Sequence, residues 1–255
     1  MTRTICVIPA RMASSRFPGK PLKPLLGMAL ILHVWNRCRL WSGFERVVVA
    51  TCDTEIKAAV EDAGGEAVMT ADTHERCTDR VEEAIGRLDL GLADDDLIVM
   101  VQGDEVLVSP EMIEEIVSVY QASKAPVVNL ISAIRNARDH DDPNVVKLVI
   151  APDGRALYFS RAPIPSRART KTLPPMYQQT GVIAFSAAFL REFSKLAPTP
   201  LEIIESVDMM RVLEHGRAIQ TVAVPIETIG VDTPADRDRA EHVLAADAVT
   251  SRYLK

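Results

Sequence analysis

The sequence has few of the features that mark a secreted, membrane-spanning or metal-cluster protein. Four of its 255 residues are cysteine, and none of them are in CxxC spacing. Such sparse cysteines favour a reduced protein over a disulfide framework or a structural zinc site. No uninterrupted apolar run approaches the length of a membrane span, and the first residues lack the apolar segment of a signal peptide. We therefore expect a cytoplasmic protein with no membrane partner.

The chain also lacks an excess of positive charge. Lysine and arginine number 29 against 35 aspartate and glutamate residues, which gives a net charge of −6. Nucleic acids and anionic membranes are bound through broad basic surfaces, so we expect no nucleic-acid partner. Any basic cluster must be local, and it is better suited to a small anion. The content of 47% hydrophobic and 25% charged residues is that of a globular protein with a sizeable core.

Common patterns of covalent catalysis are missing as well. The five histidines show no metal-ligand spacing, and neither a GxSxG motif nor a nucleophile–base pair is visible. The absence of a recognisable nucleophile favours direct displacement by an oxygen of the substrate over a covalent enzyme intermediate.

What is present is an alternation of short apolar runs with helical stretches. This order indicates an α/β fold of Rossmann-like type, in which helices cover both faces of a mostly parallel sheet. From about residue 126 apolar segments follow one another without long helices, which suggests antiparallel or mixed strands. We predict one domain over residues 1–255, with a smaller mixed β lobe at about 126–200. The predicted strands are 4–10, 46–51, 66–70, 97–104, 127–134, 145–150, 156–161, 180–186 and 221–226; the predicted helices are 29–40, 55–63, 79–88, 110–121, 202–214 and 234–246, with a mobile loop at 163–175.

The loop after the first strand gathers cations. IPARMASSRFPGKPL (Ile8–Leu22) holds Arg11, Arg16 and Lys20 among small and hydroxyl residues, which suits a polyphosphate. Ligands of open parallel sheets sit beyond the carboxyl ends of the strands, where this loop lies. The loop is not a P-loop, because a proline follows the lysine and no glycine opens it. On composition alone, a cationic loop that is merely solvated is the alternative.

Two acidic motifs follow predicted strands. In VQGDE, Asp104 comes just after a buried run and is suited to a hard cation that bridges substrate phosphates, with Gln102 as a hydrogen-bonding partner. In GVDTPAD, Thr233 and the proline after it open a helix. That capping does not require Asp232, which makes Asp232 a second candidate ligand for Mg²⁺. The alternative is that Asp104 caps a turn or a helix.

Two arginines are weaker candidates. Arg80, in RCTDR, could reach a nucleotide from the start of a helix. Arg161 ends a predicted strand before the proline-rich loop and is suited to pair with an acidic acceptor.

The motifs together resemble those of one family. They occur in the family's order from about Thr4 to Asp236, as IPARMASSRFPGKPL, ATCD, CTDRV, VQGDE, DPNVVKLV, ALYFSRAPIP, LEIIES, RVLEHG and GVDTPAD. They look like the successive motifs of the 3-deoxy-manno-octulosonate (Kdo) cytidylyltransferases, or CMP-Kdo synthetases. The resemblance implies a glycosyltransferase-A-type fold and transfer of CMP from CTP to an acidic acceptor with release of pyrophosphate. It also implies Mg²⁺ as cofactor, a homodimer and a role in lipopolysaccharide biosynthesis.

The resemblance also implies roles for single residues. Those implied to bind the nucleotide are Arg11, Ser14, Arg16, Lys20, Arg80 and Gln102. Those implied to act in catalysis are Arg11, Lys20, Asp104 and Asp232, and the two aspartates are also implied to hold the metal. Those implied to face the acceptor are Arg161, Gln179, Ile183, Asp208 and Met209.

The acceptor half departs from the family's common pattern. Members commonly read RHLGIYGY or KHIGIYAY where this chain reads QQTGVIAF, so Gln179 and Ile183 stand in place of a histidine and a tyrosine. The common ESLEQLR is ESVDMMR here, which brings in Asp208 and Met209, and SGTDR is RCTDR, which adds Arg76. Lost hydrogen-bonding groups should weaken discrimination for a polyhydroxylated acid.

Three interpretations therefore stay open. The acceptor is either Kdo or a related 3-deoxy-2-ulosonic acid, or it is a different small acid such as a phosphonate, for example phosphonoformate, in a specialised pathway. The third interpretation is a catalytically silent relative that binds CTP or CMP. Retention of both candidate metal carboxylates argues against a silent binder, since such a protein needs no intact metal pair.

Overall fold

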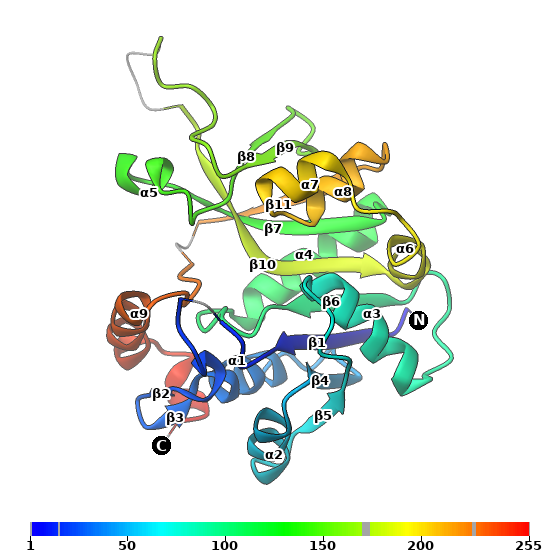
Figure 1. Cartoon of the computed structure of the whole chain (residues 1–255), viewed down its shortest axis with the longest axis vertical. Helices are drawn as coiled ribbons and strands as arrows, with labels where there is room; N and C mark the ends of the chain where they lie inside the picture. Colours follow the sequence, from blue (N-terminus) through cyan, green and yellow to red (C-terminus); the bar gives the residue numbers. More distant parts are fainter. Residues whose placement is uncertain (1, 15, 170–173, 226–227, 255) are drawn as a thin grey trace.

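The computed structural model describes residues 2–14, 16–169, 174–225 and 228–254, and a mixed β-sheet runs through its middle (Figure 1). The strands are β1 (Thr4–Ala10), β2 (Pro24–Leu25), β3 (Met28–Ala29), β4 (Arg46–Thr51), β5 (Glu66–Met69), β6 (Leu97–Val101), β7 (Val127–Ala133), β8 (Lys147–Ile150), β9 (Ala156–Ser160), β10 (Tyr177–Ser186) and β11 (Ile219–Val224). The α-helices are α1 (Leu30–Arg39), α2 (Thr54–Asp62), α3 (Cys77–Leu88), α4 (Pro110–Ser123), α5 (Ala137–Asp141), α6 (Ala187–Phe193), α7 (Pro200–Glu205), α8 (Met209–Glu214) and α9 (Pro234–Ala246). Short 3₁₀ helices cover Lys20–Leu22 and Thr250–Arg252.

The strand order of the main sheet is β11-β7-β10-β6-β1-β4-β5. Strand β1 pairs in parallel with β4 and β6, and β4 pairs in parallel with β5. Strand β10 runs the other way and is antiparallel to both β6 and β7. The antiparallel strands β8 and β9 join the sheet through the start of β10. The prediction of a mostly parallel sheet with antiparallel strands in the second half is confirmed, whereas the boundaries of a lobe at 126–200 stay a prediction.

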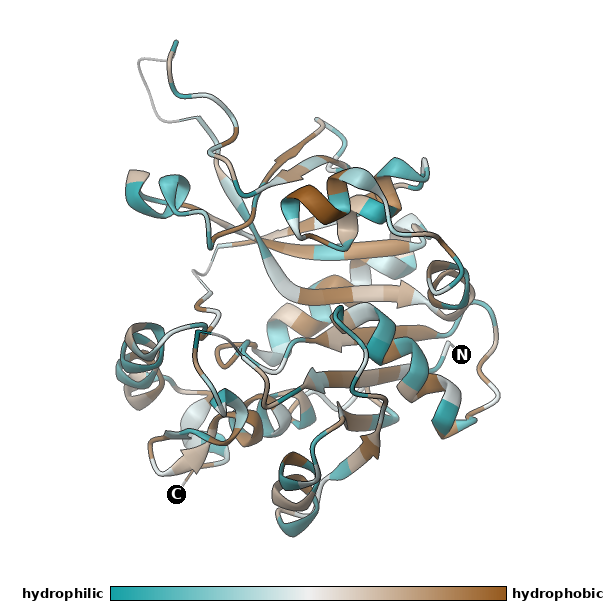
Figure 2. Ribbon diagram, viewed as in Figure 1, coloured by the Kyte–Doolittle hydropathy of each residue, from teal (hydrophilic) through white to brown (hydrophobic). Residues whose placement is uncertain are grey.

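Helices pack on both faces of this sheet, and alternate residues of β1 show why. Cys6 and Ile8 belong to the core layer that contains α1 and α4, while Ile5 and Val7 belong to the layer that contains α3 and α6. Every residue of β1 is buried, as expected for a central strand covered on both sides. Figure 2 shows the sheet strands largely in brown, and much of the outer helix surface in teal.

Several predicted elements are found at their expected bounds. The strands 4–10 and 46–51 and the helix 234–246 are matched by β1, β4 and α9. The predicted start of the last helix is confirmed too, because Thr233 accepts a hydrogen bond from the backbone N–H of Asp236. Among the described residues, no helix is both long and apolar enough to cross a lipid bilayer.

One predicted helix is wrong in extent. The single helix expected over 202–214 is two helices, α7 and α8, because Ser206 adopts a left-handed backbone conformation with φ of 54°. That conformation ends an α-helix. The predicted loop 163–175 is without regular structure where it is described, and its residues 170–173 lie outside the described part, as does residue 226 of the predicted last strand.

Candidate active site

A cleft of about 260 Å³ opens beyond the carboxyl ends of β1 and β6. This is the point where the sheet changes from parallel pairing, β6 with β1, to antiparallel pairing, β6 with β10. The residues that line the cleft are Pro9, Ala10, Arg11, Ala13, Ser14, Arg16, Lys20, Pro21, His74, Glu75, Arg76, Cys77, Arg80, Gln102, Gly103, Asp104 and Asp232. All of the residues predicted to bind the nucleotide, to act in catalysis or to hold the metal are among them.

Lys20 joins the two predicted metal ligands. Its ammonium Nζ lies 2.8 Å from Oδ2 of Asp104 and 3.1 Å from Oδ1 of Asp232. Burial acts to lower the pKa of Lys20, but Asp104 and Asp232 outweigh this effect and raise it. The ammonium therefore stays charged and offsets two carboxylates that lie far apart in the sequence.

Arg16 belongs to the same charged group and also contacts a second segment of the chain. Its Nη2 lies 2.9 Å from Oδ2 of Asp232, and its Nη1 donates to Oδ1 of Asn144 over 2.5 Å. Arg16 thus connects the first loop to the segment between α5 and β8. Because 43% of its side chain is exposed, its bonds can be exchanged for bonds to a ligand anion.

The first loop is shaped by the ends of neighbouring strands. The backbone N–H of Met12 donates to Oδ2 of Asp53, which directly follows β4, over 2.8 Å. Arg11 and Arg80 both donate to the backbone carbonyl of His74, over 3.3 and 3.5 Å. Arg80 is 2% exposed and also binds Thr70 and Ala71, so much of its donor capacity holds the loop after β5 in place.

Gln102 is held against a glycine of β10. Its backbone N–H donates to the carbonyl of Gly181 over 2.8 Å, and a Cβ added at Gly181 would lie 2.7–2.9 Å from the Gln102 side chain. Glu105 accepts the Gly181 N–H over 2.5 Å. Burial and the neighbouring Asp104 raise the pKa of Glu105 to about 7, against the effect of that hydrogen bond. Because its pKa is raised, Glu105 carries less negative charge behind Asp104 near neutral pH than an ordinary carboxylate would.

The donor set fits a magnesium ion. The ammonium of Lys20 already marks a place where a cation contacts Asp104 and Asp232 together. Among the described residues, no group of three or more His, Cys, Asp and Glu side chains gathers. A metal here would therefore complete its shell with oxygens of substrate and water, which is the usual way in which Mg²⁺ is held beside nucleotide phosphates.

The residues predicted for the acceptor are not lining residues of the cleft. Ile183 and Met209 have no exposed surface and pack in the same core layer. Gln179 donates to Oδ1 of Asn129 over 2.9 Å, and Asp208 accepts a hydrogen bond of 2.6 Å from Thr78. Ile183 and Met209 can therefore influence an acceptor only through neighbouring residues, and the acceptor role of all four stays a prediction.

Arg161 lies closer to the charged group. Its guanidinium donates to the carbonyls of Glu205 and Pro143, over 2.7 and 3.0 Å. Burial lowers the pKa of Arg161, and nearby Arg16 adds to that effect while Asp232 opposes it. These interactions place Arg161 near Arg16 and Asp232, outside the residues that line the cleft.

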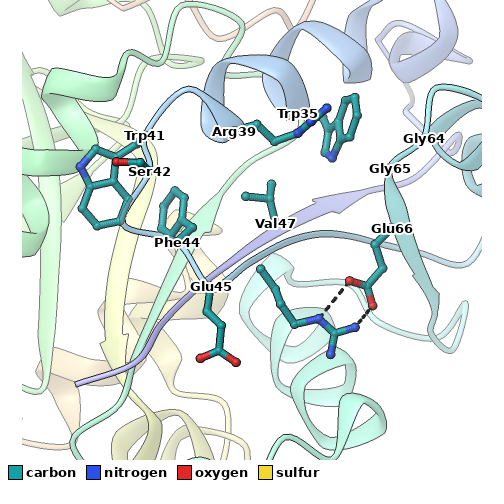
Figure 3. A pocket seen from close by; sticks show the side chains of 11 residues that line it. Trp35, Arg39, Trp41, Ser42, Phe44, Glu45, Val47, Gly64, Gly65 and Glu66 are labelled. Atoms are coloured by element: carbon teal, nitrogen blue, oxygen red, sulfur yellow. Dashed lines mark hydrogen bonds and ion pairs between the residues drawn. The ribbon is translucent and has the colours of Figure 1, made fainter. Parts of the chain in front are cut away.

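A second hollow lies at the opposite edge of the sheet, and it is a poor candidate for a phosphate site (Figure 3). It measures about 320 Å³ and lies where β4 and β5 begin, beside the end of α1. Its acidic residues are already paired, Glu66 with Arg46 and Glu45 with Arg3. Arg39 stacks on the ring of Trp35, with 4.4 Å from its guanidinium carbon to the ring centroid. No carboxylate pair suited to a metal lines it.

Some site residues were not singled out from the sequence. Asp53 and Glu105 lie in the motifs ATCD and VQGDE, shortly after buried strands, whereas Asn144 lies in DPNVVKLV, shortly before β8. Their places at strand ends could have suggested them. His74 accepts hydrogen bonds from Arg11 and Arg80 through its backbone carbonyl, which every residue has. The sequence therefore gives no sign of this role, and only the structure shows it.

Comparisons with known proteins agree on one family. The model of a family described as cytidylyltransferase matches residues 5–219. A 3-deoxy-manno-octulosonate cytidylyltransferase of Syntrophobacter fumaroxidans is 45% identical over 97% of this chain and 99% of its own. An 8-amino-3,8-dideoxy-manno-octulosonate cytidylyltransferase of Shewanella sp. (strain ANA-3) is 42% identical over 94% and 98%.

A solved structure extends this similarity to the fold. It is that of a CMP:2-keto-3-deoxy-manno-octonic acid synthetase in complex with CTP. The match has a TM-score of 0.87 and 34% sequence identity, and it covers 96% of this chain and 99% of the other.

Proposed function

Because this chain belongs to the cytidylyltransferase family, we propose that it transfers CMP from CTP to a 3-deoxy-2-ulosonic acid, Kdo or a close relative, and releases pyrophosphate. The observation that carries the proposal is the meeting of Lys20, Asp104 and Asp232 at the carboxyl ends of the central strands. In that place a triphosphate finds cations on one side and carboxylates for a metal on the other.

The reaction is a displacement at the α-phosphorus of CTP. An oxygen of the acceptor forms a bond to that phosphorus, the bond to the bridging oxygen of the β-phosphate breaks, and pyrophosphate leaves. The hydroxyl proton of the acceptor passes to water. No covalent bond to the protein is needed, which agrees with the absence of a recognisable nucleophile in the sequence.

The chain's own part in this step is to orient the triphosphate and to offset its charge. Arg11, Arg16 and Lys20 project from one loop after β1, and two of them are already bound to carboxylates. On nucleotide binding these cations can exchange their carboxylate partners for phosphate oxygens. Fixed donors aimed at the reacting phosphate stabilise the charge that spreads over it in the transition state.

We propose that Asp104 and Asp232 hold Mg²⁺ together with phosphate oxygens. When bound, the ion would neutralise the triphosphate and lower the pKa of a coordinated hydroxyl. The ammonium of Lys20 contacts both of these carboxylates, so it would have to leave them for Mg²⁺ to bind there. Its movement toward the triphosphate would bring its charge to the phosphates.

The named relatives act on eight-carbon ulosonates, one of them with an amino group at C8. This favours an ulosonic acid over a phosphonate as the acceptor, and with it a place in lipopolysaccharide biosynthesis. We further propose a homodimer. On α7, Ile203 and Ile204 are 64% and 74% exposed, and such exposed apolar side chains are suited to a subunit interface. Four free cysteines agree with a cytoplasmic location.

The test is release of pyrophosphate from CTP and MgCl₂ with a panel of acids. The panel contains Kdo, 8-amino-3,8-dideoxy-manno-octulosonate and phosphonoformate, each with CTP and with ATP. We expect turnover with CTP and an ulosonate, and formation of the corresponding CMP conjugate by mass spectrometry. Turnover with phosphonoformate and with neither ulosonate would show that the acceptor is a phosphonate and contradict the proposed one.

The same assay separates a silent binder from an enzyme. CTP binding measured by calorimetry, with no pyrophosphate released from any acid, would contradict the proposed function. Sedimentation of the purified chain and of an Ile203→Ser, Ile204→Ser variant tests the dimer, since a dimer formed through α7 would dissociate in the variant.

A further inference from the structure

Arg76 lines the cleft, and it has no role in the reaction proposed above. It directly precedes α3 in extended backbone, with φ of −103° and ψ of 144°. Its side chain does not turn toward the cationic first loop. Its Nη1 donates instead to Oγ of Ser206 over 2.9 Å, across the gap to the turn between α7 and α8. Arg76 therefore connects the cleft to the turn between α7 and α8.

A second arginine reaches the same serine. Nη2 of Arg161 donates to the backbone carbonyl of Ser206 over 3.4 Å. The pKa of Arg161 is lowered by burial first, and Arg16 and Arg76 both add to that effect. Two guanidinium groups from distant segments thus meet at Ser206, whose left-handed backbone turns both of its polar groups toward them.

The positive charge of Arg76 is not consumed by the acids around it. Its Nε lies 3.6 Å from Glu202, but Glu202 already forms two bonds of 2.7 and 2.6 Å with Arg211. Asp208 accepts from Thr78, and burial raises the pKa of Asp208. Nη2 of Arg76 has no partner among the described residues, and 24% of the side chain is exposed.

The neighbour of Arg76 does not compete for that charge. Cys77 also lines the cleft, but burial first, then Asp208 and Asp104, raises the pKa of its thiol to about 12. The thiol is therefore neutral at physiological pH. A guanidinium anchored to the Ser206 hydroxyl, loosely paired with Glu202 and with one nitrogen unpartnered among the described residues, is suited to bind a planar oxyanion.

We propose that Arg76 is a specificity-determining residue of the acceptor side and that its guanidinium binds the carboxylate of the incoming acid. The assignment rests on the proposed cytidylyl transfer. A carboxylate, and not a phosphate of CTP, is the inferred ligand because Arg76 is anchored to the α7–α8 turn, whereas Arg11, Arg16 and Lys20 project from the first loop. With Arg161 beside it, the site can hold a carboxylate between two guanidinium groups.

The first experiment measures KM for the acceptor and for CTP in the variants Arg76→Ser and Arg76→Lys. Loss of a hydrogen bond between charged groups should raise the KM of the acceptor by about tenfold to a hundredfold in Arg76→Ser. The KM of CTP should change less than about twofold, and lysine should restore part of the loss because it keeps the charge. The matched control is Arg191→Ser, which removes a surface pair with Asp94 and should resemble the wild type.

The second experiment removes the carboxylate from the ligand. Binding of the acid and of its methyl ester is measured by calorimetry in the presence of a CTP analogue with a non-hydrolysable α–β bridge. We expect the wild type to prefer the acid, Arg76→Ser to lose most of that preference and Arg76→Lys to lose part of it. The Ser206→Ala variant, which removes the anchor and keeps the guanidinium, should lose less.

The outcomes are distinct. An active wild type whose Arg76→Ser variant has a raised KM for CTP, or an unchanged KM for the acceptor, overturns the role of Arg76 and leaves the proposed function standing. A wild type without turnover overturns both. If Arg76→Ser melts far below the wild type, the proposal is tested instead with Arg76→Lys and with the methyl ester of the acid. If both Arg76→Lys and Ser206→Ala then prefer the acid over its ester as strongly as the wild type does, the proposal is contradicted.

Discussion

The two sides of the site hold their side chains in different ways. On the wall formed by the first loop, Lys20 and Arg16 are held by ion pairs with Asp104 and Asp232, and part of the surface of these groups is exposed. On the far wall, by which we mean the packed region of β10 and α7–α8 outside the residues that line the cleft, Ile183 and Met209 are wholly buried. The first wall can exchange partners when a charged ligand arrives, whereas the second is fixed by packing.

This difference has a physical basis. Ion pairs at a partly solvated surface are weak and are replaced at small cost. Close-packed apolar side chains resist displacement, since any change of volume is felt by their neighbours. The nucleotide side should therefore respond to single charge changes through activity, and the far wall should respond to changes of volume through stability.

The largest effect is expected from the carboxylates. Asp104→Ala should reduce turnover by about a thousandfold, because it removes a proposed metal ligand and leaves Lys20 with one carboxylate. Pyrophosphate release measures the loss, and Asp94→Ala on the surface is the matched control. Substantial residual activity in Asp104→Ala would show that the metal assignment is wrong.

A smaller effect is expected from the cation between them. Lys20→Met should lower kcat by about a hundredfold, since a charge aimed at the phosphates is lost. Without its ammonium, Asp104 and Asp232 repel each other, so MgCl₂ alone should raise the melting temperature of the variant more than that of the wild type. Lys23→Met is the control. An equal response to MgCl₂ in both proteins would argue against a shared metal site.

The contact between the two walls can be tested at Gly181. In Gly181→Ala, the new Cβ would lie 2.7–2.9 Å from the Gln102 side chain, so Gln102 has to move. We expect the KM of CTP to rise by about tenfold. Gly86→Ala, which places a Cβ in open space, should leave that KM unchanged. An unchanged KM of CTP in Gly181→Ala would show that Gln102 does not help to bind the nucleotide.

The far wall should lose stability and keep its affinity for the acceptor. Met209→Ala opens a cavity in the core and should lower the free energy of unfolding by about 2–5 kcal/mol. Urea denaturation measures this loss, and the volume-conserving Met209→Leu should cost less than about 1.5 kcal/mol. A tenfold change in acceptor KM in Met209→Leu would instead place this residue in direct reach of the acceptor.

The smallest effect concerns the loop after β5. Glu83 accepts from the Ala71 N–H over 2.8 Å and from His74 over 2.5 Å, and these bonds, with Arg87, outweigh burial and lower its pKa from 4.5 to about 2. A carboxyl whose pKa is lowered on folding stabilises the protein above its unfolded pKa and loses this contribution as pH falls toward the folded value. Glu83→Gln should therefore lower the melting temperature by about 2–4 °C at pH 7 and by less at pH 3.

The control for Glu83 is Glu82→Gln on the same helix. Differential scanning calorimetry at both pH values measures the effect. If the gap between wild type and Glu83→Gln grows as the pH falls, the anchoring role of Glu83 is contradicted.

Much of the fold could be predicted because its signals are local. The apolar run of β1 and the Thr-Pro pair that opens α9 each determine their element within a few residues of sequence. The helix predicted over 202–214 failed because Ser206 has no strong intrinsic preference for the left-handed conformation that breaks it. Tertiary contacts from Arg76 and Arg161 hold Ser206 there, and such contacts cannot be read from neighbouring residues.

The sequence by itself determined the chemistry of the nucleotide side. Loops that follow buried strands lie at one edge of a parallel sheet, so Lys20, Asp104 and Asp232, each in a loop after a predicted strand, could be expected to meet. Only the tertiary structure decided which residues form the far wall. Ile183 and Met209 look like altered acceptor contacts in the sequence, yet both face the core, while Arg76 reaches the cleft and Ser206. The physical reason is that a side chain's exposure depends on what packs against it, and those neighbours come from segments far away in the sequence, as Met100 and Asn129 do for Ile183.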